Sequence, residues 1–178
     1  MDIKEALLQE HSKRQTIAIA NYIGNNSTRF NALMKLVLGN EPLLVQRGYW
    51  VLGYCAEAHP GLFKNHIEPL LNHLYKVGIH DAVKRNTLKV FQFIKVPDKM
   101  LGAVVDICFG YLYSASEAIA VKSLSINLLV DTCMRYPELK EELIPLLHEL
   151  STHDAPAILS STRNGIALLN KRIKKGSF

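Results

Sequence analysis

Long hydrophobic runs, paired cysteines and motifs for catalysis are all scarce in this sequence of 178 residues. No segment reaches about 18 uninterrupted apolar residues, the length that a membrane-spanning helix requires. The opening stretch MDIKEALLQEHSKRQ carries charges from its second residue and lacks the apolar core of a signal peptide. We therefore expect a cytoplasmic protein that does not associate with membranes.

Motifs for enzymatic chemistry are missing as well. The sequence has no glycine-rich phosphate loop, no GxSxG elbow, no HExxH motif and no carboxylate pair that differs from ordinary surface charge. The three cysteines, Cys55, Cys108 and Cys133, are widely spaced in apolar stretches without a CxxC pair, which predicts reduced and buried thiols. We expect a protein that is not an enzyme and holds no cofactor.

Four histidines, His59, His66, His73 and His80, follow one another at intervals of seven residues. Seven residues correspond to two helical turns, roughly 10 Å, whereas metal ligands on one helix usually lie three or four residues apart. These histidines therefore cannot share one ion. Their spacing predicts a solvated helix face and no metal site.

The net charge of +5 is unevenly distributed along the chain. Residues 1–162 carry 16 basic and 16 acidic residues, whereas the last 16 residues carry five basic residues and no acid. The ending NKRIKKG is typical of a final helical turn, where cations complement the helix dipole and Gly176 provides the cap. An electrostatic contact site is the alternative interpretation of the same residues.

Apolar residues recur at helical spacing along nearly the whole chain, and no stretch shows the two-residue alternation of a half-buried strand. Breaks rich in glycine, proline and asparagine divide the chain into about nine segments of mostly about 11 to 20 residues. The pattern predicts an all-α fold.

Two stretches, HIEPLLNHL from His66 and ELIPLLHEL from Glu142, share an apolar skeleton around Pro-Leu-Leu. Their prolines, Pro69 and Pro145, lie 76 residues apart, which is twice 38. A shift of 38 residues also aligns LLVQRGYWVLGY, DAVKRNTLKVFQ and IAVKSLSINLLV. One period holds two helices whose apolar faces are buried only when successive units stack, so the chain is predicted to be a helical solenoid. The aligned apolar positions expected in its core are Val45, Leu52, Val83, Val90, Val121 and Leu128.

This organisation resembles the HEAT repeat family: a helix pair every 38 residues, a proline in the first helix (IEPLLNHL, LIPLLHEL) and Val-x-Arg near the start of the second (VQR, VKR). The resemblance implies a right-handed α-α superhelix that forms a single domain over residues 1–178. The prolines either bend the first helix or occupy its first turn. The implied organisation is about four helix pairs at 28–58, 63–94, 97–135 and 138–174, with residues 1–24 as an N-terminal capping helix.

The repeated arginines, Arg47 and Arg85, lie at equivalent positions of the second helices. HEAT-like proteins commonly use this position to bridge adjacent repeats, so a structural role is the first interpretation. A binding site on the concave surface is the alternative, because the helix VKRNTLKVFQFIK has basic residues outside its apolar core stripe. The pattern is broken in the third unit, which has Ser123, and in the fourth, where the basic residue moves to Arg163. The candidate partner-binding residues are Arg47, Lys84, Arg85, Lys89, Gln92, Lys122 and Arg163.

A HEAT-like solenoid without catalytic motifs is expected to be a protein-binding or scaffolding module that uses its concave surface. The alternative is a nucleic-acid-binding protein related in architecture to the HEAT-like alkylpurine DNA glycosylases. Trp50 aligns with Leu88 and Ile126 in a predicted core row, which leaves no tryptophan to hold a damaged base. No motif singles out a catalytic acid such as Asp106 or Asp131, and the balanced charge before the C-terminal segment disfavours phosphate binding. We therefore expect a protein partner, with nucleic acid as the alternative.

Overall fold

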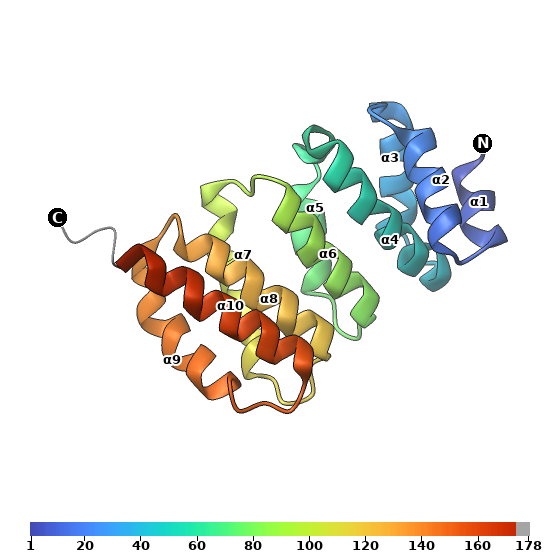
Figure 1. Cartoon of the computed structure of the whole chain (residues 1–178). Coiled ribbons are helices and arrows are strands. Elements are labelled where there is room, and N and C mark those ends of the chain that lie inside the picture. Colours follow the sequence, from blue (N-terminus) through green and yellow to red (C-terminus); the bar gives the residue numbers. More distant parts are fainter. Residues whose placement is uncertain (174–178) are drawn as a thin grey trace. The chain divides into compact units, whose positions relative to one another are not determined.

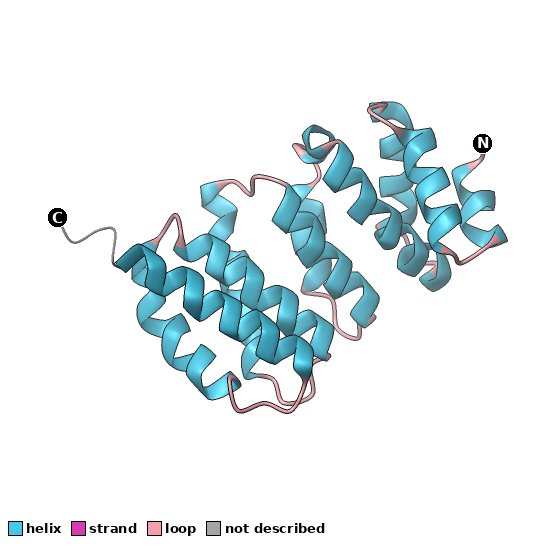
Figure 2. Cartoon of the chain, viewed as in Figure 1, coloured by secondary structure: helices cyan, strands magenta, loops and turns pink. Residues whose placement is uncertain are grey.

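The computed structural model describes residues 1–173, and every regular element in this range is a helix (Figure 2). The all-α prediction is confirmed. The expected cap at Gly176 and the basic residues Lys174 and Lys175 lie outside the described residues. The α-helices are α1 (Ile3–Gln9), α2 (Lys13–Ile23), α3 (Ser27–Val37), α4 (Pro42–Ala58), α5 (Ile67–Leu74), α6 (Asp81–Phe93), α7 (Asp98–Tyr113), α8 (Ile119–Cys133), α9 (Lys140–Leu150) and α10 (Pro156–Ile173), with two short 3-10 helices, η1 (Pro60–Phe63) and η2 (Pro137–Leu139).

The even-numbered helices, which we call the inner helices, follow the predicted repeat. From α4 to α10 they begin at Pro42, Asp81, Ile119 and Pro156, each about one 38-residue period after the last. Helix α4 packs along both α2 and α6, and α10 packs along α8 (Figure 1). The repeat read from the sequence is therefore a repeat of helix pairs in the structure.

The N-terminal segment forms two helices, where one capping helix was expected. Helix α1 has only seven residues, and it ends before a short break at Glu10. The Ser12 side chain then starts α2, because its hydroxyl oxygen accepts a hydrogen bond from the backbone N–H of Gln15 at 3.1 Å. The segment thus resembles a further helix pair, with α2 packed along α4 as an inner helix.

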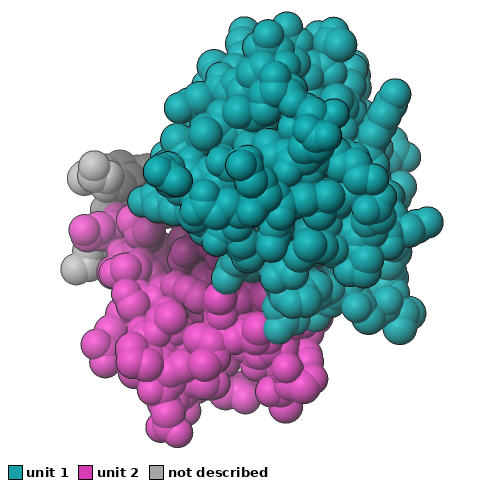
Figure 3. All heavy atoms as spheres, turned by 90° about the vertical axis from the view of Figure 1, so that its right-hand side faces the viewer, with its two compact units in different colours: residues 1–100 teal, residues 101–178 magenta. Residues whose placement is uncertain are grey.

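Residues 1–100 form one compact unit and the residues from Leu101 onward form a second, coloured teal and magenta in Figure 3. Helices α1 to α6 belong to the first unit, and α8 to α10 belong to the second. Each unit contains its own buried apolar side chains. The expectation of one continuous superhelical domain stays a prediction.

Five of the six apolar side chains expected in the core are buried. Val45 is the exception: it lies in the first turn of α4, beside the exposed Leu43, and is only partly buried. The predicted core row of Trp50, Leu88 and Ile126 needs a similar correction, because Leu88 and Ile126 are fully buried but Trp50 is not. The larger indole extends to the surface, where it packs edge to face with the His11 ring; the two ring centres are 5.3 Å apart.

The two repeated prolines occupy different places in their helices. Pro69 is the third residue of α5, within the first turn, where a missing N–H costs no helical hydrogen bond. Pro145 lies inside α9 and removes one such bond there. The first-turn role is therefore found for Pro69, whereas the bending role stays a prediction for Pro145.

Close packing of the inner helices depends on two glycines. A Cβ atom at Gly48 would lie 2.5 Å from Val37 Cγ1, so α4 approaches α3 at a distance that only glycine permits. A Cβ atom at Gly165 would lie 2.8 Å from Val130 Cγ2, which gives α10 and α8 the same kind of contact. These positions explain why the second helices of two different repeats contain glycine at their centres.

Candidate binding surface on the inner helices

Arg47 links the first two helix pairs. Its Nη1 group donates hydrogen bonds to the backbone carbonyl oxygens of Leu7, at 2.7 Å, and Leu8, at 3.0 Å. These carbonyls belong to the last turn of α1, where a cation complements the negative end of the helix dipole. Arg47 therefore has the bridging role considered for it, and its guanidinium is already engaged.

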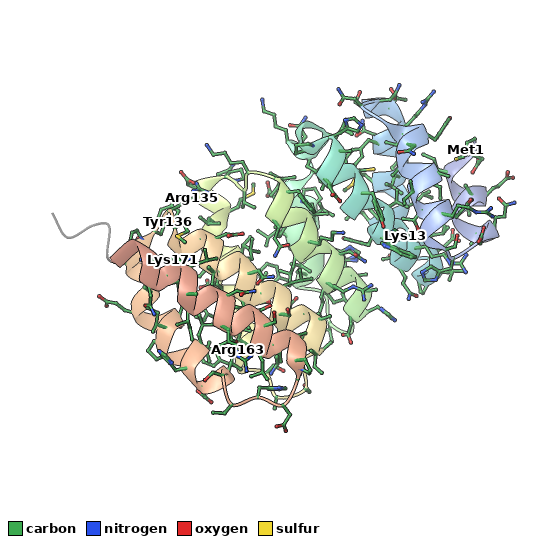
Figure 4. The ribbon with its side chains drawn as sticks, viewed as in Figure 1. Met1, Lys13, Arg135, Tyr136, Arg163 and Lys171 are labelled. Atoms are coloured by element: carbon green, nitrogen blue, oxygen red, sulfur yellow. The ribbon has the colours of Figure 1, made fainter. Side chains whose placement is uncertain are left out.

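The same repeat position holds a different contact in the second unit. One and two periods after Arg85 lie Ser123 and Ser161, whose hydroxyl oxygens are 2.7 Å apart and join α8 to α10. The repeat pattern predicts Arg163 as the basic residue of this unit, but Ser161 makes the contact at the repeat position. Arg163 is exposed on α10, as Figure 4 shows, and does not take part in this contact.

Lys89 crosses from α6 to α4. Its ammonium nitrogen lies 5.3 Å from the centre of the Tyr54 ring on α4 and 6.0 Å from that of the Phe93 ring on α6. A cation above aromatic faces is attracted by the ring quadrupoles. The contact holds the charged end of Lys89 beside Phe93, which is 40% exposed.

Two further candidates extend this surface along α6. Arg85 is exposed and makes no hydrogen bond or ion pair with any residue from 1 to 173. Gln92 is half-buried. Since Arg85, Lys89 and Gln92 follow one another at helical intervals of four and three residues, they lie on one side of α6. We call these three residues, with Tyr54 and Phe93, the basic-aromatic face.

The remaining candidates are placed differently. Lys84 pairs with Asp81, one turn earlier on α6, at an N–O distance of 3.7 Å. Lys122 on α8 is only 7% exposed and presents little surface to a partner. Lys122 and Arg163 also belong to the second unit, whereas the other five candidates belong to the first. The structure therefore brings together three of the seven predicted residues: Arg85, Lys89 and Gln92.

A buried polar chain lies behind this surface. His73 was predicted on a solvated helix face, but it is only 6% exposed, and its Nδ1 atom lies 2.7 Å from the Tyr49 hydroxyl. Thr87 on α6 lies close to the same Tyr49 hydroxyl, and its own hydroxyl donates to the Val83 carbonyl at 2.8 Å. The tautomer of the His73 ring decides which of Tyr49 and His73 donates. Burial lowers the pKa of His73, and the charge of Lys76 lowers it further.

We expect His73 to make the stability of the protein depend on pH. Because its pKa is lower in the folded chain than the ordinary 6.5, the unfolded chain takes up the proton first as the pH falls. The free energy of unfolding should therefore decrease below about pH 6.5. Urea denaturation at pH 7.5 and 5.5 should show a smaller decrease for His73→Gln than for the wild type. The exposed His148 on α9 provides the control, and equal decreases in both variants would contradict the assignment.

Three other histidines have separate structural partners. His66 Nε2 lies 2.9 Å from Asn31 Oδ1, and burial lowers the pKa of His66. His80 and His153 each precede an inner helix, and the Nδ1 atom of each accepts a backbone N–H at 3.0 Å. Within residues 1–173, no group of three or more histidine, cysteine or acidic side chains is arranged to hold a metal ion.

The three cysteines are buried and free. Burial raises the pKa of the Cys55 and Cys108 thiols to about 12 and that of Cys133 to about 11. A thiol with so high a pKa forms almost no thiolate near neutral pH, and the thiolate is the nucleophilic form. The structure therefore gives these cysteines a packing role.

Comparison with known proteins agrees with this repeat geometry. A family model described as a HEAT repeat domain matches residues 3–169. The chain belongs to the HEAT repeat family. No curated protein matches the HEAT repeat chain closely enough to extend this assignment to a function.

Two solved structures resemble this HEAT repeat protein. The first is a designed armadillo repeat protein in complex with the peptide (KR)4, with a TM-score of 0.62 and 16% identity over 94% of this chain and 80% of the other. The second is an engineered protein, with a TM-score of 0.49 and 11% identity over 96% of this chain and 99% of the other. At 16% identity, the resemblance to the designed armadillo repeat protein supports the repeat fold alone.

The charge of the HEAT repeats differs along the chain. Residues 1–100 carry 13 basic and eight acidic residues, a net charge of +5, whereas residues 101–162 carry three basic and eight acidic residues, a net charge of −5; residues 163–178 add five basic residues, so the second unit as a whole is neutral. The balance noted for residues 1–162 is thus the sum of two opposite charges. The basic-aromatic face lies in the positive unit. None of the helices within residues 1–173 has the length and apolarity to cross a membrane.

Proposed function

We propose that this HEAT repeat protein is a non-enzymatic protein-binding module that contacts its partner through the basic-aromatic face. The observation that carries the proposal is the position of Lys89 across Tyr54 and Phe93, next to the unpaired Arg85. Aromatic and arginine side chains are the residue types that contribute most to protein interfaces. The fold makes no use of Arg85, in contrast to Arg47.

The first fold neighbour is a repeat protein in complex with a peptide of alternating lysine and arginine. That observation concerns the neighbour, and it supports our proposal because it is a complex between a repeat protein of similar fold and a peptide. The positive charge of residues 1–100 favours a partner of the opposite sign, rich in aspartate or glutamate. The three buried free thiols favour a reducing compartment, so we propose a cytoplasmic role.

Nucleic acid is the second candidate partner, and two observations keep it in consideration. Trp50 is partly exposed, and the first unit has a net charge of +5. Bases stack on aromatic side chains, and phosphates bind basic ones. The protein partner is preferred because Arg47 and Lys84, two of the basic residues nearest this surface, already have intramolecular partners.

Affinity capture from native cells, with the purified chain as bait, tests the proposed function. We expect a protein to be retained equally well with and without nuclease treatment, and to be lost when Arg85→Glu and Lys89→Glu are combined. The matched control is the double variant Lys13→Glu and Lys35→Glu, which makes the same charge change at exposed positions of α2 and α3; Lys13 is labelled in Figure 4. Capture that disappears with nuclease would favour the nucleic-acid alternative.

A further inference from the structure

A hollow of about 460 Å³ lies in the first unit, where the C-terminal end of α6 meets η1 and the start of α5. None of the seven candidate partner-binding residues lines this hollow. Its volume lies in the range of about 300 to 1,000 Å³ that is ordinary for binding pockets. The side chains that matter for its chemistry are Phe63, Lys64, Ile67, Phe93, Ile94 and Lys95.

The floor of the hollow is apolar. Phe63 is fully buried beneath it, whereas Ile67 and Ile94 are 5% and 8% exposed and keep a small apolar surface at the hollow. Phe93 forms a wall and stays 40% exposed. The exposed Phe93 ring is in contact with water. An apolar group that enters the hollow would remove this apolar surface from water, which is favourable.

The rim of the hollow is positively charged. Lys64 and Lys95 are both exposed, and neither makes an ion pair or hydrogen bond with any residue in the described range 1–173. Lys89 adds a third ammonium group, 6.0 Å from the Phe93 ring centre. No acidic residue lines the hollow. Glu68 lines a neighbouring hollow, which Lys64 and Lys99 also line.

We propose that this hollow binds an acidic peptide segment of a protein partner, with one bulky apolar side chain of the segment inserted beside Phe93 and onto Ile67 and Ile94. The proposal rests on the proposed protein-binding function and names the chemistry of the partner. Carboxylates on either side of the inserted side chain pair with Lys64 and Lys95. The volume exceeds that of one side chain, so a short stretch of peptide backbone enters with it.

Charge complementarity selects this occupant over others. The C-terminal segment of the chain is basic, so it would be repelled by the lysine rim. A nucleic acid would satisfy the lysines but would bring no aliphatic group to the apolar floor, and specific nucleic-acid binding uses many more than two basic contacts. An acidic segment with a phenylalanine, tryptophan or leucine matches both the floor and the rim.

A displayed library of random 12-residue peptides, selected on the full chain, tests the proposal. We expect the selected peptides to contain phenylalanine, tryptophan or leucine flanked by aspartate or glutamate. Selection of lysine- and arginine-rich peptides, or of no peptide at all, would overturn the proposal. The best selected peptide is then labelled with a fluorophore, and its affinity is measured by fluorescence anisotropy.

Three variants locate the bound peptide. Phe93→Ala and the double variant Lys64→Glu with Lys95→Glu should each weaken the peptide by roughly tenfold or more, the size expected for central interface residues. The control Lys13→Glu with Lys35→Glu should change the affinity less than threefold. All of the replaced side chains are exposed, so the variants should keep the wild-type circular dichroism and thermal midpoint. Unchanged affinity in folded hollow variants would overturn the proposal.

The outcome is distinguishable from that of the proposed function. If native capture depends on Arg85 and Lys89 but no acidic peptide is selected, the protein-binding function stands and the hollow is not its peptide site. If binding of the selected peptide is abolished by duplex DNA in competition, or if the chain dimerises through the hollow in analytical ultracentrifugation and excludes the peptide, the proposed occupant is wrong.

Discussion

Replacement of Phe30 by alanine is expected to reduce the free energy of unfolding of the first unit by about 3 to 5 kcal/mol. Phe30 on α3 is 1% exposed. Its ring packs edge to face with the Phe63 ring, with 4.7 Å between the ring centres, and with the His66 ring, with 5.3 Å between the centres. The replacement removes these contacts and leaves a cavity between α3, η1 and the start of α5. Such a cavity collapses only in part, which adds to the loss of apolar burial.

Urea denaturation followed by circular dichroism measures the effect of Phe30→Ala. The control is Leu43→Ala, because Leu43 lies on α4 of the same unit but is 44% exposed. We expect the control to cost less than about 1 kcal/mol. A loss for Phe30→Ala no greater than that of the control would show that α3 does not pack as described.

The second large effect is expected at Leu52, which is fully buried on α4. Leu52→Ala should reduce the free energy of unfolding by about 2 to 5 kcal/mol, because its site is filled on all sides. Val45 provides a matched comparison, since it lies two turns earlier on the same helix and was assigned to the same core by the repeat. Because Val45 is only partly buried, Val45→Ala should cost about 1 kcal/mol or less.

The same urea denaturation, with both variants measured in parallel, checks this difference. Equal losses would mean that burial along α4 follows the repeat position alone and that Val45 is as well packed as Leu52. A loss for Leu52→Ala below about half a kcal/mol would refute the 38-residue register itself.

The repeat was predictable because the same local sequence pattern recurs several times along the chain. Apolar side chains at helical spacing, a 38-residue interval and the paired prolines of Pro69 and Pro145 all point to stacked helix pairs. The bridging role of Arg47 was one of two roles considered, and it was implied by the resemblance to HEAT-like proteins. The seven-residue helix α1 escaped prediction because so short a helix has little periodic signal of its own.

Features that depend on partners from other helices were not predictable. His73 looked solvated because its own helix gives no sign of Tyr49, which lies 24 residues away on α4 and supplies its buried hydrogen bond. Trp50 shares a repeat position with Leu88, but its larger ring does not fit the same space. The hollow at Phe93 is assembled from two separate stretches of the chain, 60–67 and 93–97, and neither has a sequence motif. A single sequence gives no measure of such contacts.

The contact between Trp50 and His11 gives the protein a built-in optical probe. The chain contains one tryptophan, so excitation at the red edge of the protein absorption band reports from a single place, the junction between the first two inner helices and the loop after α1. The indole emission therefore reports on whether the loop after α1 stays packed against α4.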